Sequence, residues 1–146
     1  MASAAAYLRL LTSAVFMSAV LAAPGGAQET APTLLLELNA AQPSDKGCRL
    51  TFVVTNNLDG DLDRAAFELA LFNAEGIVDR LTVLEFRDMP NGKTKVSRFD
   101  LAGTDCGKVS RVLVNHATDC VGTGIEPAAC MRGLKTSTKG GIAFGV

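Results

Sequence analysis

CRLTFVVT, the sequence of residues 48–55, alternates in chemical character from one residue to the next. One set of positions holds Cys, Leu, Phe and Val, and the other holds Arg, Thr, Val and Thr. A period of two with many β-branched residues is typical of a strand that buries one of its faces. The turn-forming run NNLDGD at residues 56–61 then ends the strand. This segment therefore predicts a protein built on β-sheets.

Further segments with strand character lie on both sides of this one, separated by turn-forming residues. We expect strands at residues 33–39, 65–72, 77–86, 93–101, 109–115 and 141–146. Residues 116–139 have no sustained period of two, and there we expect an irregular, disulfide-bearing excursion with one helical turn near residues 127–134. About seven short strands without a long helical period predict an all-β fold, an antiparallel immunoglobulin-like β-sandwich.

The N-terminal 27 residues have the features of a secretory signal peptide. Arg9 is their only charged residue, an apolar stretch covers residues 10–23, and small residues follow Pro24. Such a pattern is typical of a leader that is cleaved after small residues. We place the cleavage after Ala27, with Ala23 as the second choice.

The apolar stretch is shorter than the about 20 residues of a membrane-spanning helix. We therefore expect no membrane span after signal removal, a flexible N-terminus at residues 28–32 and a single domain at residues 33–146. The expected location is the periplasm or the cell exterior. The formal net charge of −1 gives no reason to expect nucleic acid as a partner, because that function requires clustered lysine and arginine.

The chain contains four cysteines, Cys48, Cys106, Cys120 and Cys130. An even number in an exported protein predicts two disulfides. The close pairs of a zinc site and the C-x-x-C of a redox site are both missing from the sequence. Of the three possible pairings we favour Cys48–Cys106 and Cys120–Cys130, because in an up-and-down strand order the first pair lies at one end of the sandwich. Each bond is worth about 3–4 kcal/mol in loop-closure entropy.

A family resemblance rests on residues 50–101, which read LTFVVTNNLDGDLDRAAFELALFNAEGIVDRLTVLEFRDMPNGKTKVSRFDL. A strand ending in Thr-Asn, a strand ending in Leu-Phe-Asn, an x-Gly hairpin and a Pro-x-Gly-Lys turn resemble bacterial exported immunoglobulin-like domains of the FxLYD type. The whole mature chain is also similar to small secreted proteins of unknown function from alphaproteobacteria. The resemblance implies a small sandwich without catalysis and supplies no site residue.

Two sets of residues are candidates for chemistry. Asp59, Asp61 and Asp63 gather carboxylates in one turn, although an EF-hand fails because position 12 of its loop falls on an alanine. His116 is the only histidine, with Asp119 nearby and Ser110 on the preceding strand. No G-x-S-x-G motif surrounds a serine in the sequence. We predict no catalytic, cofactor-binding or metal-binding residues, and no cofactor.

The polar stretch at residues 135–139 is expected to be a solvated loop, with contact to a ligand as the alternative. The sequence as a whole favours a non-enzymatic binding or accessory module whose partner is an envelope protein. Its expected binding surface is the end of the sandwich formed by residues 56–64 and 116–139, or an exposed sheet edge that accepts a strand. The alternatives are a calcium-binding surface protein and a small hydrolase that uses His116.

Overall fold

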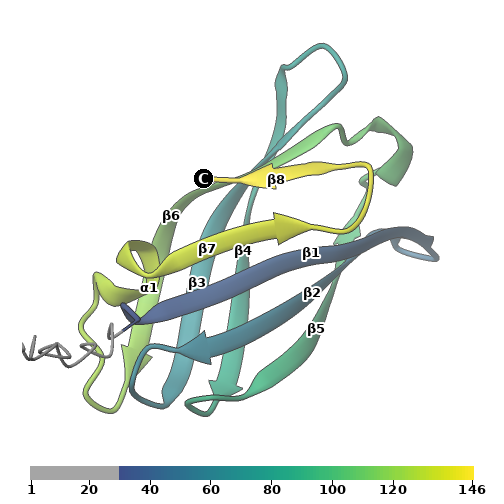
Figure 1. The fold of residues 1–146 in the computed structure, drawn as a ribbon. Helices are drawn as coiled ribbons and strands as arrows, with labels where there is room; N and C mark the ends of the chain where they lie inside the picture. Colours follow the sequence, from purple (N-terminus) through teal and green to yellow (C-terminus); the bar gives the residue numbers. More distant parts are fainter. Residues whose placement is uncertain (1–29) are drawn as a thin grey trace, which may run out of the picture.

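The computed structural model describes residues 30–146 (Figure 1). The predicted signal peptide, with its cleavage after Ala27 or Ala23, lies outside the described residues. So does the first part of the flexible N-terminus predicted at residues 28–32.

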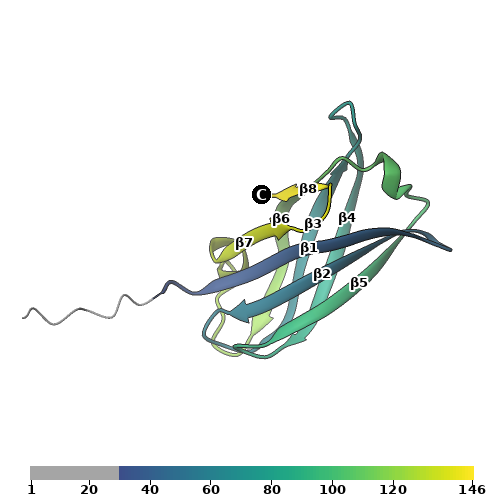
Figure 2. The same ribbon diagram turned by 45° about the vertical axis from the view of Figure 1, so that its right-hand side comes forward.

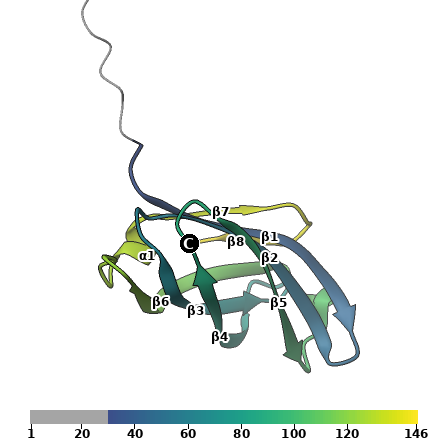
Figure 3. The ribbon, with the colours of Figure 1, turned by 90° about the horizontal axis from the view of Figure 1, so that it is seen from below.

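In the described part of the chain, eight strands form two four-stranded sheets that pack face to face as a β-sandwich. In chain order they are β1 (Thr33–Ser44), β2 (Gly47–Asn57), β3 (Leu62–Phe72), β4 (Val78–Met89), β5 (Thr94–Ala102), β6 (Arg111–Gly122), β7 (Leu134–Thr138) and β8 (Ala143–Gly145). The 3₁₀ turn η1 (Cys106–Lys108) precedes β6, and the short helix α1 (Ala129–Arg132) precedes β7. One sheet has the order β5-β2-β1-β7 and the other β4-β3-β6-β8. Figure 3 shows the two layers one above the other.

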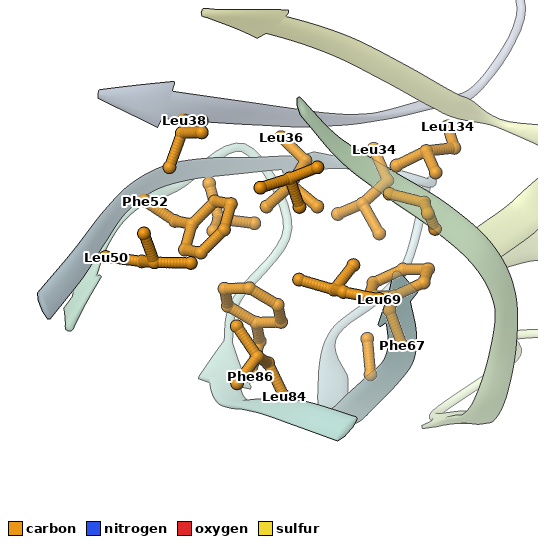
Figure 4. Packing of buried hydrophobic residues seen from close by; sticks show 14 of the residues in the cluster. Leu34, Leu36, Leu38, Leu50, Phe52, Phe67, Leu69, Leu84, Phe86 and Leu134 are labelled. Atoms are coloured by element: carbon orange, nitrogen blue, oxygen red, sulfur yellow. The ribbon is translucent and has the colours of Figure 1, made fainter. Parts of the chain in front are cut away.

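The core lies between the sheets and follows the alternation visible in the sequence. In β2, Leu50, Phe52 and Val54 are buried, whereas Arg49, on the other face of the strand, is exposed. The ring of Phe52 packs edge-to-face against the ring of Phe86 from the opposite sheet, with the ring centroids 5.6 Å apart (Figure 4). Such contacts between aromatic rings add to the stabilisation from burial of apolar area. The predicted β-sandwich is therefore confirmed.

The strand count and the pairing differ in part from the prediction. Residues 30–146 form eight strands, and two of the pairs are parallel: β1 with β7, and β6 with β8. The other pairs are antiparallel, as expected. The parallel pairs arise because the C-terminal segment adds one strand to the margin of each sheet and turns between them at residues 139–142 (Figures 1 and 2).

The irregular excursion predicted at residues 116–139 is confirmed at residues 123–133, which hold turns and the helix α1, and is wrong toward both of its ends. Strand β6 continues to Gly122, and the polar stretch at residues 135–139, predicted to be a loop, largely forms β7. The period of two is lost in β6 because its register against β3 shifts opposite Ala66/Phe67 and again opposite Glu68/Leu69. The predicted helical turn near residues 127–134 is confirmed as α1.

Both favoured disulfides are confirmed, and strand pairing places the cysteines of the first one close together. Cys48 lies opposite Leu101 in the antiparallel β2–β5 pair, and Cys106 follows shortly after Leu101. The Cα atoms of Cys48 and Cys106 are 4.9 Å apart, and those of Cys120 and Cys130 are 5.8 Å apart. The second bond ties α1 to β6. Two disulfides are compatible with an exported protein, since such bonds persist in oxidising compartments.

The two sides of the sandwich are different. On one side, the turn at residues 139–142 joins the marginal strands β7 and β8. On the other side, β4 and β5 form the margins, and no described strand pairs with their outer edges. Across residues 30–146, none of the helices has the length and apolar character that a membrane crossing requires.

Candidate functional site

A cleft lies at the end of the sandwich where the chain enters β1 and where α1 packs. Its volume is about 470 Å³, and residues that are distant in the sequence line it. Among them are Pro32, Leu58, Asp59, Ile125, Glu126 and Arg132. The two segments at residues 56–64 and 116–139 therefore meet here, at the end of the sandwich that the sequence indicated as a binding surface.

Asn56 holds the first wall of the cleft in place. Its side chain is fully buried at the end of β2. The Asn56 Nδ2 donates hydrogen bonds to Gly60 O and Met89 O, both at 2.8 Å. Its Oδ1 accepts one from the Leu58 N–H at 3.0 Å. A buried amide with these bonds satisfied fixes the β2–β3 loop to the end of β4, since leaving any of these groups unpaired is costly.

The alternation of β2 indicates this role of Asn56, although residues 56–61 were predicted only as a turn. Asn56 continues the buried set of even-numbered positions in β2 beyond Val54. A polar residue at a position that the period assigns to the core predicts a buried hydrogen-bonding group. Its side chain therefore points into the sandwich, whereas an ordinary turn residue faces solvent.

The second wall is held by the Cys120–Cys130 disulfide and by backbone contacts. The Leu34 N–H donates to Gly133 O at 2.9 Å, which fixes the C-terminal end of α1 to the start of β1. Gly122 lets this wall approach the first, because a Cβ at this position would lie 2.1 Å from Asp61 O. No larger residue fits there without movement of the backbone. The cleft is thus framed by covalent and backbone contacts on both sides.

The chemistry of the cleft is apolar inside and charged at the margin. Pro32 and the half-buried Ile125 provide apolar surface. At the margin, Arg132 Nη2 lies 2.7 Å from Glu126 Oε2, and both side chains are largely exposed. Asp59 stands on the β2–β3 loop with a φ of 64°. An apolar centre with a polar rim is the usual anatomy of a protein–protein interface.

The acidic loop does not gather its carboxylates around one point. Asp61 Oδ1 accepts a hydrogen bond of 2.8 Å from the Asn91 N–H, so this side chain ties the β2–β3 loop to the β4–β5 turn. Asp59 and Asp63 stand on either side of it in the sequence. In the part of the chain that the structure describes, no group of three or more His, Cys, Asp or Glu side chains is placed to hold a metal ion.

The three residues of the hydrolase alternative have different partners. His116 Nδ1 lies 3.7 Å from Glu68 Oε1, on the solvent-facing side of β6. Asp119 forms an ion pair with Arg64. The Ser110 hydroxyl donates to Phe72 O and Asn73 O at the other end of β6. His116 lies six positions after Ser110, which corresponds to about 20 Å along a strand. The fold does not bring the three side chains together.

The polar stretch at residues 135–139 contacts β1. The Thr138 hydroxyl donates to Leu38 O at 3.2 Å, and Lys139 Nζ lies 3.9 Å from Glu37 Oε2. These side chains thus support the β1–β7 pair and do not line the cleft.

Comparisons with protein-family models, with curated proteins and with solved structures found no match to this chain. The resemblance to FxLYD-type domains and to secreted alphaproteobacterial proteins therefore stays a prediction. The candidate site rests on the geometry of the cleft alone.

Proposed function

We propose that this chain is an exported, non-enzymatic binding module that recognises an envelope protein through the cleft beside α1. The proposal includes removal of the signal peptide at residues 1–27, a location in the periplasm or cell exterior, and an immunoglobulin-like relationship of the sandwich. One observation carries it. Two segments distant in the sequence converge on an apolar cleft with a charged margin, and both are fixed in place before any partner arrives.

The fixed walls matter for affinity. Ordering a flexible loop on binding costs free energy, and a loop that is already ordered avoids this cost. Asn56 on one wall and the Cys120–Cys130 disulfide on the other supply that order. The apolar residues would then provide the central contact, and Glu126 and Arg132 at the margin would select the partner by charge.

The test is photocrosslinking in living cells. A photoreactive amino acid at Ile125, in the cleft, is compared with one at Val96, which is 58% exposed on the margin of the opposite sheet. We expect the Ile125 position alone to capture a defined envelope protein. The captured protein is then purified, and its binding to the mature chain is measured by calorimetry.

Matched charge reversals test the site itself. Glu126→Arg removes the ion pair at the margin of the cleft and should weaken the complex at least tenfold, which corresponds to about 1.4 kcal/mol. Glu75→Arg makes the same change on the exposed β3–β4 turn and should leave the affinity unchanged. Equal capture from both photoreactive positions, or equal affinity of both variants, would contradict the proposal.

A further inference from the structure

The strand β4 exposes apolar side chains at the edge of its sheet. Leu81 is 56% exposed and Val83 is 51% exposed, and both face away from the core. β4 is the first strand of its sheet, and within residues 30–146 no strand pairs with its outer edge. Unpaired backbone groups beside exposed apolar side chains readily accept another strand.

The backbone groups at this outer edge can be identified from the hydrogen bonds of the neighbouring strand. Phe72 O in β3 accepts a hydrogen bond from the Ser110 N–H, on the side of β6. Because backbone groups alternate in direction along a strand, the even-numbered residues of β3 face β6. These residues lie opposite the odd-numbered residues of β4, such as Val83 opposite Glu68. The N–H and C=O groups of those odd-numbered residues therefore point to the outer edge of β4.

A contact from the other sheet supports this assignment. Lys95 Nζ of β5 donates to Arg87 O at 2.9 Å and to Asp88 O at 2.8 Å. Arg87 is an odd-numbered residue, and Lys95 reaches its carbonyl, as the alternation predicts. The regular alternation ends at the next residue, Asp88, whose φ is 53°. Lys95 therefore covers one end of the outer edge.

The other end of the edge is closed as well. The register between β3 and β4 shifts at Asp79, which has no partner between Val78 and Arg80. The Arg80 side chain turns across the sandwich, and its Nη1 donates to Ala102 O at 2.7 Å and to Thr104 Oγ1 at 2.9 Å. The free outer edge is thus residues 81–85, and Val83 is its midpoint.

We propose that β4 pairs antiparallel with β4 of a second copy of this chain, about a two-fold axis at Val83. Val83 then lies opposite Val83 of the second copy, and Leu81 lies opposite Glu85. Residues that face each other in this way exchange both backbone hydrogen bonds, so the free edge supplies about six such bonds. Every free backbone group in the edge is used, and the two sheets become one continuous sheet.

Charge favours this register. At each end of the pair, Asp79 of one copy faces Arg87 of the other. Lys95, which donates to the Arg87 carbonyl, adds a second positive charge there. A shift that centres the pair on Thr82 places Asp79 opposite Glu85, and like charges opposite each other destabilise a strand pair. A shift that centres it on Leu84 pairs Leu81 with Arg87, whose carbonyl Lys95 covers. The unshifted register alone places unlike charges at both ends and leaves no free edge group unused.

This inference uses a different surface from the proposed function. The cleft lies beside α1, and none of the residues that line it belongs to β4. The two proposals can therefore fail separately.

The first test is sedimentation velocity of the mature, disulfide-bonded protein over a range of concentrations. We expect a reversible monomer–dimer equilibrium. Val83→Lys places two like charges on the two-fold axis and should raise the dimer dissociation constant at least tenfold. Val96→Lys introduces the same charge at a similarly exposed position on the margin of the opposite sheet and should leave the equilibrium unchanged.

The second test determines the register of the β4–β4 pair. Facing residues that exchange hydrogen bonds have Cα atoms about 5.5 Å apart, which is within disulfide range. Val83→Cys should therefore form an intermolecular disulfide on mild oxidation, whereas Val96→Cys should not. Asp79→Arg and Arg87→Asp should each weaken the dimer, and the double variant should recover it because each facing pair again has unlike charges.

Peptide mapping of each variant for both native disulfides establishes that it is folded. A wild-type protein that stays monomeric up to millimolar concentration would overturn the proposal. So would a Val83→Lys variant that dimerises as strongly as the wild type. A dimer that Val83→Cys fails to cross-link, or that the charge exchange fails to recover, would overturn the register.

Discussion

Replacing Asn56 with alanine should lower the free energy of unfolding by about 3–5 kcal/mol. The two hydrogen bonds that Asn56 Nδ2 donates are each worth about 1 kcal/mol net. The buried Leu58 N–H would also lose its acceptor, and a buried unsatisfied group costs about 1–3 kcal/mol more. For a domain of this size the melting temperature should fall by roughly 10–25 °C.

The assay is guanidinium unfolding with both disulfides intact, and the control is the neighbouring residue. Asn57 is exposed at the end of β2, so Asn57→Ala should change the free energy of unfolding by less than about 0.5 kcal/mol. The slope of the free energy against denaturant should be the same for all three proteins, because the fold and the area exposed on unfolding do not change. A loss below about 1 kcal/mol for Asn56→Ala would refute the reasoning, since water would then be replacing the amide.

Three further results are expected. Gly122→Ala should cost at least about 2 kcal/mol in chemical unfolding, because its Cβ would meet Asp61 O, whereas Gly140→Ala meets nothing within 4 Å and should be neutral. The hydrogen bond from Arg49 lowers the pKa of the Asp100 carboxyl, so its contribution to stability is present above pH about 4 and is lost as the pH falls through the lowered value. Asp100→Asn should therefore slightly flatten the fall of melting temperature in acid, and salt should reduce the difference because the pair is exposed. Calcium or a chelator should leave the melting temperature unchanged, because a ligand of the native state would raise it and the acidic loop does not converge.

The sequence predicted the central part of the fold well, for a physical reason. In β2 one face is buried and the other is exposed, so the alternation of residues 48–55 records the structure directly. The Cys48–Cys106 pairing followed from placing both cysteines at one end of the sandwich. That placement holds because β2 and β5 run antiparallel, with Cys48 opposite Leu101.

The C-terminal third was harder to predict because its structure depends on partners distant in the chain. β6 bulges twice against β3, which moves successive side chains to the other face and hides the period of two. β7 has the polar sequence Lys-Thr-Ser-Thr after Leu134 and becomes a strand because β1 offers a free margin. Neither the bulges of β6 nor the pairing of β7 can be predicted from the residues of those segments alone.

The sequence predicted where the candidate site lies, but not which contacts hold it in place. Turn-forming residues located both loops at one end of the sandwich, and the cleft confirms only that these loops meet. The role of Asn56 could have been predicted from its position two residues after the buried Val54. A polar residue on the buried face of a strand requires hydrogen-bond partners.

The parallel pairing of the first strand with one of the last has a consequence for the order of folding. Leu34 of β1 lies opposite Leu134 of β7, and Thr138 bonds to Leu38 across a sequence separation of 100 residues. A chain that emerges N-terminus first, from a ribosome or from a translocation pore, therefore presents β1 long before its neighbour exists. Contacts of such long range slow folding, because the loop must close before they form. Until the final dozen or so residues emerge, one margin of β1 stays open to any other strand, so a truncation after residue 133 should yield chains that aggregate during synthesis.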